Sequence, residues 1–123
     1  MKRILVIDDA ATVRMYHRNI LEEAGYLVDE AINGVEALEK ALQANYDLYL
    51  VDVNMPKLDG YGFLRELRSN DIPQAPAIMI STEAAAEDRQ RAYAAGANFY
   101  MAKPMQPEQL LAPVALMLGE ARP

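Results

Sequence analysis

The strongest constraint on the fold is a regular alternation between short apolar runs and longer amphipathic segments. Each apolar run has five or six residues and contains the aliphatic and aromatic side chains that favour a strand. Each following segment repeats its apolar residues at the three- and four-residue spacing of a helix. Residues 34–45, for example, carry Val35, Leu38, Ala41 and Leu42 on one face. Strands are predicted at residues 3–7, 26–31, 47–51, 76–80 and 98–102, and helices at 11–24, 34–45, 60–70 and 83–96, with a last helix from Pro107.

Five strands that alternate with five helices predict an α/β fold in which helices cover both faces of one parallel sheet. The nearly continuous apolar strands agree, because a strand between two helix layers has no solvent face. No linker, repeat or low-complexity segment interrupts the 123 residues, a length typical of one domain. We expect one three-layer, doubly wound (βα)5 domain over residues 1–123, with no output domain.

Composition argues against several classes of protein. The chain is 52% hydrophobic, which argues against disorder, and it has no cysteine for disulfides or thiolate metal sites. Its net charge of −6 and its scattered basic residues disfavour nucleic-acid binding. The apolar run at 110–118 is far shorter than the ~20 residues of a membrane helix, and the N-terminus lacks a signal-peptide core. We expect a cytoplasmic protein that does not insert into membranes.

Polar residues follow four of the five predicted strands. They are Asp8 and Asp9, then Asp52, then Ser81 and Thr82, and finally Lys103. The carboxyl ends of parallel strands meet at one edge of the sheet, where open α/β sheets form their sites. We expect these side chains to converge there, although Ser81 or Thr82 could also cap the helix that follows.

Three neighbouring carboxylates cannot all stay ionised unaided, since one pair at ~4 Å repels by about 4 kcal/mol at an effective dielectric near 20. Protonation or a bound cation would relieve the repulsion. Oxygen ligands without histidine or cysteine favour Mg²⁺, which is often shared with phosphate oxygens. Lys103 and Ser81 would add a charge and a hydroxyl donor for a phosphoryl group. The sequence has no nucleotide-binding glycine loop, so Asp52 is the candidate for a covalent aspartyl phosphate.

The stretches "IDDA", "VDVNMPKLDGYGFL", "ISTEA" and "AAGANFYMAKP" resemble the receiver domain of bacterial two-component response regulators, most closely the stand-alone, chemotaxis-type (CheY-like) members. The resemblance spans residues 4–118 and implies a flavodoxin-like fold with strand order 2-1-3-4-5. It implies that Asp52 accepts a phosphoryl group from a sensor histidine kinase or histidine phosphotransfer protein, with Mg²⁺ as cofactor. A protein of this kind catalyses only its own phosphorylation and dephosphorylation. A cis peptide before Pro104 is also implied.

The resemblance assigns further roles around the acceptor. Asp9, Asp52 and the backbone carbonyl of Asn54 would bind Mg²⁺ directly, and Asp8 would act largely through water. Lys103 would contact the phosphoryl group.

Switching and lifetime involve a second set of residues. Ser81 lies 22 residues before Lys103, as the switch hydroxyl does in the family, and would move to the phosphoryl group, with Thr82 as the less favoured alternative. Tyr100 would then move inward. Asn54 and Glu83 flank the acceptor and the hydroxyl, and they would set the lifetime of the phosphoryl group.

The output face is where this chain departs most from the family. The face formed by helix 83–96, strand 98–102 and the last helix would select a downstream target protein, in chemotaxis or another pathway. Met105 stands where the family commonly has a phenylalanine. Before the last helix, Gln106 and Pro107 replace the hydroxyl or acidic residue that more usually caps it, and Pro113 should kink this helix. A monomer is expected, with dimerisation on phosphorylation as an alternative.

Three other function classes share parts of this pattern. A Mg²⁺-dependent phosphatase acting through an aspartyl phosphate often has a second acid two residues after its nucleophile, where this chain has Ala10 and Asn54. A flavodoxin-type electron carrier would need a hydroxyl- and glycine-rich loop in place of Asp8 and Asp9. A receiver used as an unphosphorylated scaffold would need only the fold.

Two features of helix 11–24 have purely structural interpretations. His17 lies on its apolar side, so a packed histidine is favoured over a phosphodonor. Arg14 and Arg18, with the acids near the end of the helix, are interpreted as a solvated surface.

Overall fold

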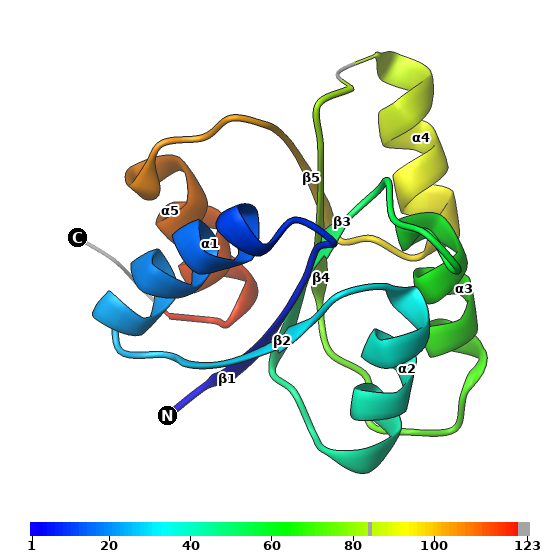
Figure 1. Cartoon of the computed structure of the whole chain (residues 1–123), viewed down its shortest axis with the longest axis horizontal. Helices are drawn as coiled ribbons and strands as arrows, with labels where there is room; N and C mark the ends of the chain where they lie inside the picture. Colours follow the sequence, from blue (N-terminus) through cyan, green and yellow to red (C-terminus); the bar gives the residue numbers. More distant parts are fainter. Residues whose placement is uncertain (84, 121–123) are drawn as a thin grey trace.

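The computed structural model describes residues 1–83 and 85–120, which form three layers around a central sheet (Figure 1). The strands are β1 (Arg3–Ile7), β2 (Leu27–Ala31), β3 (Leu48–Asp52), β4 (Ala77–Ser81) and β5 (Phe99–Ala102). The helices are α1 (Ala11–Glu23), α2 (Gly34–Gln43), α3 (Gly60–Ser69), α4 (Ala86–Ala95) and α5 (Pro107–Met117). Neighbouring strands are parallel, in the order β2-β1-β3-β4-β5, which confirms the predicted doubly wound, flavodoxin-like fold.

Two hydrophobic cores hold the sheet between its helices. Helices α1 and α5 cover one face, and α2, α3 and α4 cover the other (Figure 1). Alternate residues of β1 divide between the cores, because successive side chains of a strand point to opposite faces. Leu5 and Ile7 pack under α2, α3 and α4, whereas Ile4 and Val6 pack under α1 and α5. Burial of each such side chain contributes about 1.5–3 kcal/mol.

The register of the strands aligns their carboxyl ends at one edge of the sheet. The terminal pairs are Ile7 with Val51, Asp52 with Ile80, and Ser81 with Ala102. The residues that follow β1, β3, β4 and β5 consequently emerge side by side, as in other open α/β sheets.

Helix α2 corrects one prediction from the sequence pattern. Val35 and Leu42, expected on its buried face, are 42% and 52% exposed. The buried residues are Gly34, Ala37 and Ala41. The small side chains face inward because the helix packs closely. A Cβ at Gly34 would overlap the backbone of the loop before α3.

The start of the fourth helix also differs from the prediction. Helix α4 begins at Ala86 rather than at residue 83, and Ala84 lies outside the described residues. Helix α5 continues through Pro113 to Met117, although proline cannot donate a backbone hydrogen bond. Within residues 1–83 and 85–120, no helix has the length and apolar character needed to cross a membrane.

Candidate functional site

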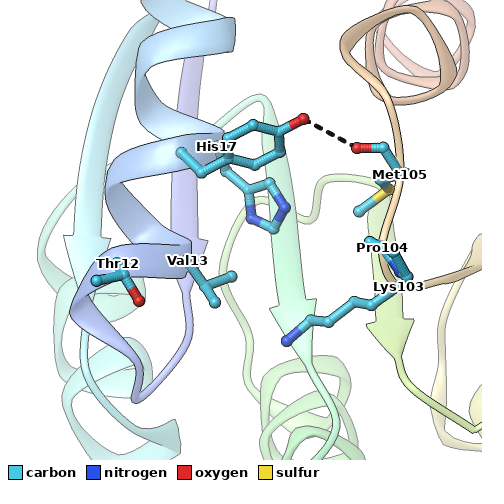
Figure 2. Close-up of a pocket in the computed structure, with 7 residues that line it drawn as sticks. Thr12, Val13, His17, Lys103, Pro104 and Met105 are labelled. Atoms are coloured by element: carbon cyan, nitrogen blue, oxygen red, sulfur yellow. Dashed lines mark hydrogen bonds between the residues drawn. The ribbon is translucent and has the colours of Figure 1, made fainter.

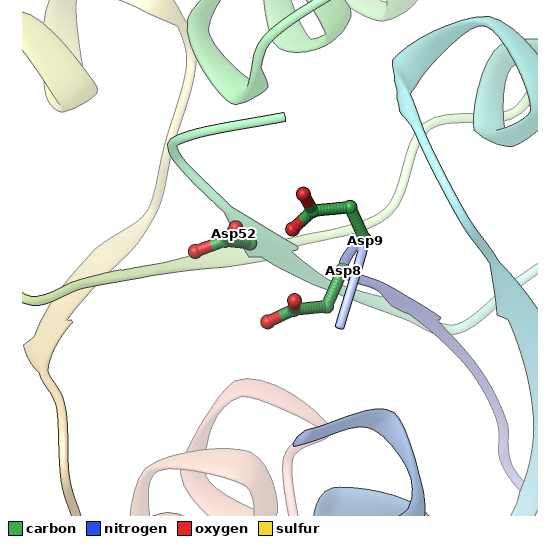
Figure 3. Close-up of side chains that lie close together, drawn as sticks. All are labelled: Asp8, Asp9 and Asp52. Atoms are coloured by element: carbon green, nitrogen blue, oxygen red, sulfur yellow. The ribbon is translucent and has the colours of Figure 1, made fainter. Parts of the chain in front are cut away.

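The acids that follow β1 and the acid that ends β3 form one cluster (Figure 3). Asp8, Asp9 and Asp52 each offer a carboxylate oxygen, and these oxygens lie within 4.8 Å of one another. Asp8 and Asp52 are buried and Asp9 is exposed, so the cluster opens to solvent beside Asp9. At an effective dielectric near 20, a pair of like charges at ~5 Å repels by about 3 kcal/mol.

Lys103, just beyond β5, places its ammonium against the buried part of this cluster. Its Nζ lies 2.9 Å from Asp8 Oδ2 and 2.9 Å from Asp52 Oδ1. One ammonium cannot balance three carboxylates, and a divalent cation would offset the remaining charge. An oxygen-only ligand set with one side open to water fits Mg²⁺, which usually keeps several waters.

Burial and charge act in opposite directions on the two partners of this pair. Burial raises the pKa of the Asp52 carboxyl above its ordinary value, the hydrogen bond from Lys103 lowers it, and the charges of Asp8 and Asp9 raise it further. Burial acts to lower the pKa of Lys103, but its hydrogen bonds to Asp52 and Asp8 hold that pKa above its ordinary value. Lys103 stays protonated, and ionised Asp52 would be stabilised by an added cation.

The loop after β3 fixes the backbone of Asp52. Asp59 caps α3 by accepting a hydrogen bond from the Gly62 N–H (2.8 Å), and Gly60 N–H donates to the Val53 carbonyl (2.9 Å). A Cβ at Gly60 would overlap the carbonyl oxygen of Asp52. Glycine at this position allows α3 to begin directly against the end of the strand that carries the acid.

The backbone of Glu83 holds the predicted switch residues in place. Ser81 is buried, and its Oγ accepts a hydrogen bond from the Glu83 N–H (3.0 Å). The Tyr100 hydroxyl donates to the Glu83 carbonyl (2.6 Å), and the tyrosine is only 1% exposed. The guanidinium carbon of Arg89 lies 5.2 Å from the Tyr100 ring centroid. Helix α4 has Ala85 as its N-cap residue, without a side-chain cap, so the alternative capping role of the hydroxyls is wrong.

The other predicted residues surround this centre. Asn54, two residues after Asp52, and Glu83, two residues after Ser81, are both exposed. Met105 is buried in the core under α1 and α5, and Pro107 is the first residue of α5. The peptide between Lys103 and Pro104 is cis, as the resemblance implied.

A groove of about 510 Å³, lined by Arg89, Tyr100, Met105 and Pro113 among others, lies between α4, β5 and α5.

A mostly apolar pocket of about 200 Å³ separates α1 from the loop before α5 (Figure 2). The hydroxyl of Tyr16 donates to the Met105 carbonyl (3.1 Å) and joins its two sides. His17 lines it and is only 3% exposed, which confirms the packed histidine. Burial lowers the pKa of His17 to about 4, the charge of Lys103 adds to this effect, and Asp8 opposes it. Its Nδ1 has no hydrogen-bond partner among the described residues.

Arg14 corrects the prediction of a fully solvated surface on α1. Its side chain is 14% exposed, its Nε lies 2.9 Å from Glu30 Oε1, and its Nη1 lies 2.8 Å from the Asp8 carbonyl oxygen. No local pattern indicated these contacts, because Glu30 is distant in the sequence and Asp8 is contacted through its backbone.

Fold and site together define a receiver domain of two-component signalling. The family profile described as the response regulator receiver domain matches residues 4–115, so the chain belongs to this family. It is a CheY-like receiver domain, a signalling module of the kind that interacts with histidine kinases and downstream targets.

Individual relatives agree with this assignment. The transcriptional regulatory protein ResD of Bacillus subtilis is 39% identical over 119 residues, and the match covers 97% of this chain and 49% of ResD. The chain therefore spans about half the length of that relative. Chemotaxis protein CheY1 of Helicobacter pylori is 39% identical over 121 residues, covering 95% of this chain and 97% of CheY1.

Solved structures match over nearly the whole chain. Chemotaxis protein CheY4 of Vibrio cholerae superposes with a TM-score of 0.90 at 36% identity, covering 95% of this chain and 98% of CheY4. Response regulator protein TrrA of Thermotoga maritima, solved in complex with Mg²⁺-BeF, gives a TM-score of 0.85 at 33% identity. That match covers 95% of this chain and 99% of TrrA.

Proposed function

We propose that Asp52 accepts a phosphoryl group from the phosphohistidine of a sensor histidine kinase or a histidine phosphotransfer protein, with Mg²⁺ bound beside it. The observation that carries the proposal is the 2.9 Å contact between Asp52 and Lys103 inside a cluster of three carboxylates. The relative TrrA, solved in complex with Mg²⁺-BeF, supports the choice of metal.

The proposed step is an in-line displacement at phosphorus. A carboxylate oxygen of Asp52 forms the new O–P bond as the P–N bond breaks, and the electrons of that bond return to the donor imidazole nitrogen, which takes a proton from solvent. The Lys103 ammonium, now shared between two carboxylates, would donate to a phosphoryl oxygen. Asp9, Asp52 and the Asn54 carbonyl would hold Mg²⁺ directly and Asp8 largely through water. The metal would supply additional positive charge for the phosphoryl oxygens.

Phosphorylation would act on the segment between β4 and α4. The Ser81 hydroxyl would exchange the Glu83 N–H for a phosphoryl oxygen, so the backbone of Glu83 would lose one of its two anchors. Tyr100 is already buried in this structure, so phosphorylation is proposed to stabilise its inward position rather than to create it.

The groove between α4, β5 and α5 is the proposed binding face for a downstream target protein. It adjoins Tyr100 and carries the departures at Met105 and Pro113. ResD and CheY1 are named for transcriptional regulation and chemotaxis respectively, and both are 39% identical to this chain. We infer that the pathway is decided by this face rather than by the phosphorylation site.

Asn54 and Glu83 are the proposed determinants of phosphoryl lifetime. Both residues are exposed and follow Asp52 and Ser81 by two positions, so their side chains could admit or exclude the hydrolytic water. Exchanging either for a residue of different size or charge should change the rate of self-dephosphorylation without preventing phosphorylation.

The proposal is tested by incubating the protein with acetyl phosphate and Mg²⁺ and measuring its intact mass. The parent should gain one phosphoryl group, and chelation of Mg²⁺ should prevent the gain. Asp52→Asn should gain none. Asp47→Asn is the matched control, because Asp47 lies just before the start of β3, at the opposite end from Asp52, and it should be labelled like the parent. Labelling of Asp52→Asn would refute the proposal.

A further inference from the structure

The peptide between Asp8 and Asp9 is held by a side chain from the first helix. Its carbonyl oxygen accepts a hydrogen bond from Arg14 Nη1 (2.8 Å). This peptide joins the two acids, so its orientation determines where the Asp9 carboxylate lies relative to Asp8. The Asp8 side chain is fixed separately by the Ala10 N–H (2.9 Å) and by Lys103.

Glu30, near the end of β2, anchors the other side of the Arg14 guanidinium. Arg14 Nε lies 2.9 Å from Glu30 Oε1, and Arg18 Nη1 lies 2.6 Å from Glu30 Oε2. The next residue, Ala31, accepts a hydrogen bond from the Asp8 N–H (3.1 Å) through its carbonyl. The turn after β1 is therefore attached to β2 twice, once through its own backbone and once through Arg14.

Helix α1 begins without the usual means of fixing its first turn. Its N-cap residue is Ala10, which has no side-chain hydrogen-bond acceptor, and its first turn carries no acid. Side-chain caps usually satisfy and orient this part of a helix. The contact of Arg14 with the Asp8 carbonyl provides an alternative constraint on the same turn.

We propose that Arg14 is a positioning residue for the divalent-cation site, acting by holding the Asp8–Asp9 peptide against Glu30. This inference rests on the proposed function, which requires Mg²⁺ at the same acids. Arg14 touches neither the metal nor the phosphoryl group in this account. It keeps the Asp9 carboxylate in the orientation that binds the cation, and outer partners of this kind typically affect metal affinity by about 10- to 100-fold.

Charge alone predicts the opposite effect. Arg14 carries a positive charge near the acid cluster, so its removal would strengthen binding of a cation by reducing repulsion. A positioning role predicts weaker binding after the same change. The sign of the change in Mg²⁺ affinity therefore separates the two explanations.

The experiment is an isothermal titration of the purified full chain with MgCl₂, repeated with the variants Arg14→Ala, Arg14→Lys and Met15→Ala. We expect the Kd for Mg²⁺ to rise about tenfold in Arg14→Ala. Arg14→Lys should lose nearly as much Mg²⁺ affinity, because one ammonium cannot replace the donors that the planar guanidinium places on both the Asp8 carbonyl and Glu30. Met15→Ala is the control on the same helix, since Met15 is 61% exposed, and its Kd should equal that of the parent.

Each other outcome is decisive. Unchanged or tighter Mg²⁺ binding in Arg14→Ala would overturn the positioning role while leaving the proposed function intact. An equal loss in Met15→Ala would also overturn it, because the effect would then arise from general damage to α1. A parent that binds no Mg²⁺ would refute both the inference and the metal in the proposed function. Far-ultraviolet circular dichroism shows whether each variant is folded. If Arg14→Ala does not fold, the Kd of Arg14→Lys for Mg²⁺ tests the positioning role in its place.

Discussion

The Lys103 ammonium lies 2.9 Å from a carboxylate oxygen of Asp52, although 51 residues separate them in the chain. The contact links the ends of β3 and β5, which are separated in the sheet by β4. The structure thus places a cation beside a buried carboxylate, as the proposed phosphoryl acceptor requires.

Asp52→Asn should stabilise the fold in the absence of Mg²⁺. Burial raises the folded-state pKa of Asp52, so the ionised carboxylate is disfavoured in the fold. The stability that the neutral carboxyl contributes at low pH is therefore lost as the pH rises through that pKa. We expect the free energy of unfolding at pH 7 to increase by about 1 kcal/mol, measured by urea denaturation. Glu39→Gln, at an exposed acid on α2, should change it by less than about 0.5 kcal/mol. A destabilised Asp52→Asn would contradict this account of the cluster.

Gly60→Ala should damage the site and the fold together. Its Cβ would overlap the Asp52 carbonyl oxygen and come within 3.0 Å of Val53 Cα, and neither backbone atom can move freely. We expect a loss of about 2 kcal/mol or more in urea denaturation, with slower phosphorylation by acetyl phosphate. At Gly62 in the same helix, the nearest atoms to an added Cβ belong to side chains, namely the end of Leu58 and, at 3.3 Å, Asp59 Oδ1. Gly62→Ala should therefore cost less than about 1 kcal/mol. Equal effects of the two changes would argue against a constrained backbone at Asp52.

Tyr100→Phe should remove the hydrogen bond to the Glu83 carbonyl while keeping the ring beneath Arg89. A buried hydrogen bond contributes about 1 kcal/mol net, and this one measures 2.6 Å. The variant should unfold at lower urea, with a free energy about 1 kcal/mol below that of the parent. Tyr93→Phe, at a tyrosine that is 46% exposed, should have no measurable effect. An unaffected Tyr100→Phe would show that the hydroxyl does not hold the inward position.

His17 should make the protein less stable in mild acid. Because its folded-state pKa is about 4 and its unfolded value about 6.5, the unfolded chain binds more protons between these values, and stability falls as pH falls. From pH 7 to about pH 4.5 this amounts to about 2 kcal/mol. The acidic side chains titrate in both the parent and His17→Leu. Subtracting the free energy of unfolding of His17→Leu from that of the parent at each pH therefore isolates the contribution of His17. Parallel stability curves would contradict the assigned pKa.

The sequence was sufficient to predict the fold class and the convergence of the acids with Lys103. Both depend on periodicity and on which residues follow each strand. It was not sufficient for Arg14, whose partners are a distant glutamate and a backbone carbonyl. The buried face of α2 was also mispredicted at Val35 and Leu42, because close packing selects small residues over larger apolar ones.

The central claim is that Asp52 carries the phosphoryl group, and mapping the modified residue tests it most directly. The protein would be incubated with acetyl phosphate and Mg²⁺, reduced with borohydride to trap the acyl phosphate, and analysed by peptide mass spectrometry. We expect modification at Asp52 alone, at no more than one group per chain and only when Mg²⁺ is present. Modification at another residue, or hydrolysis of the donor with no trapped intermediate at Asp52, would contradict the claim.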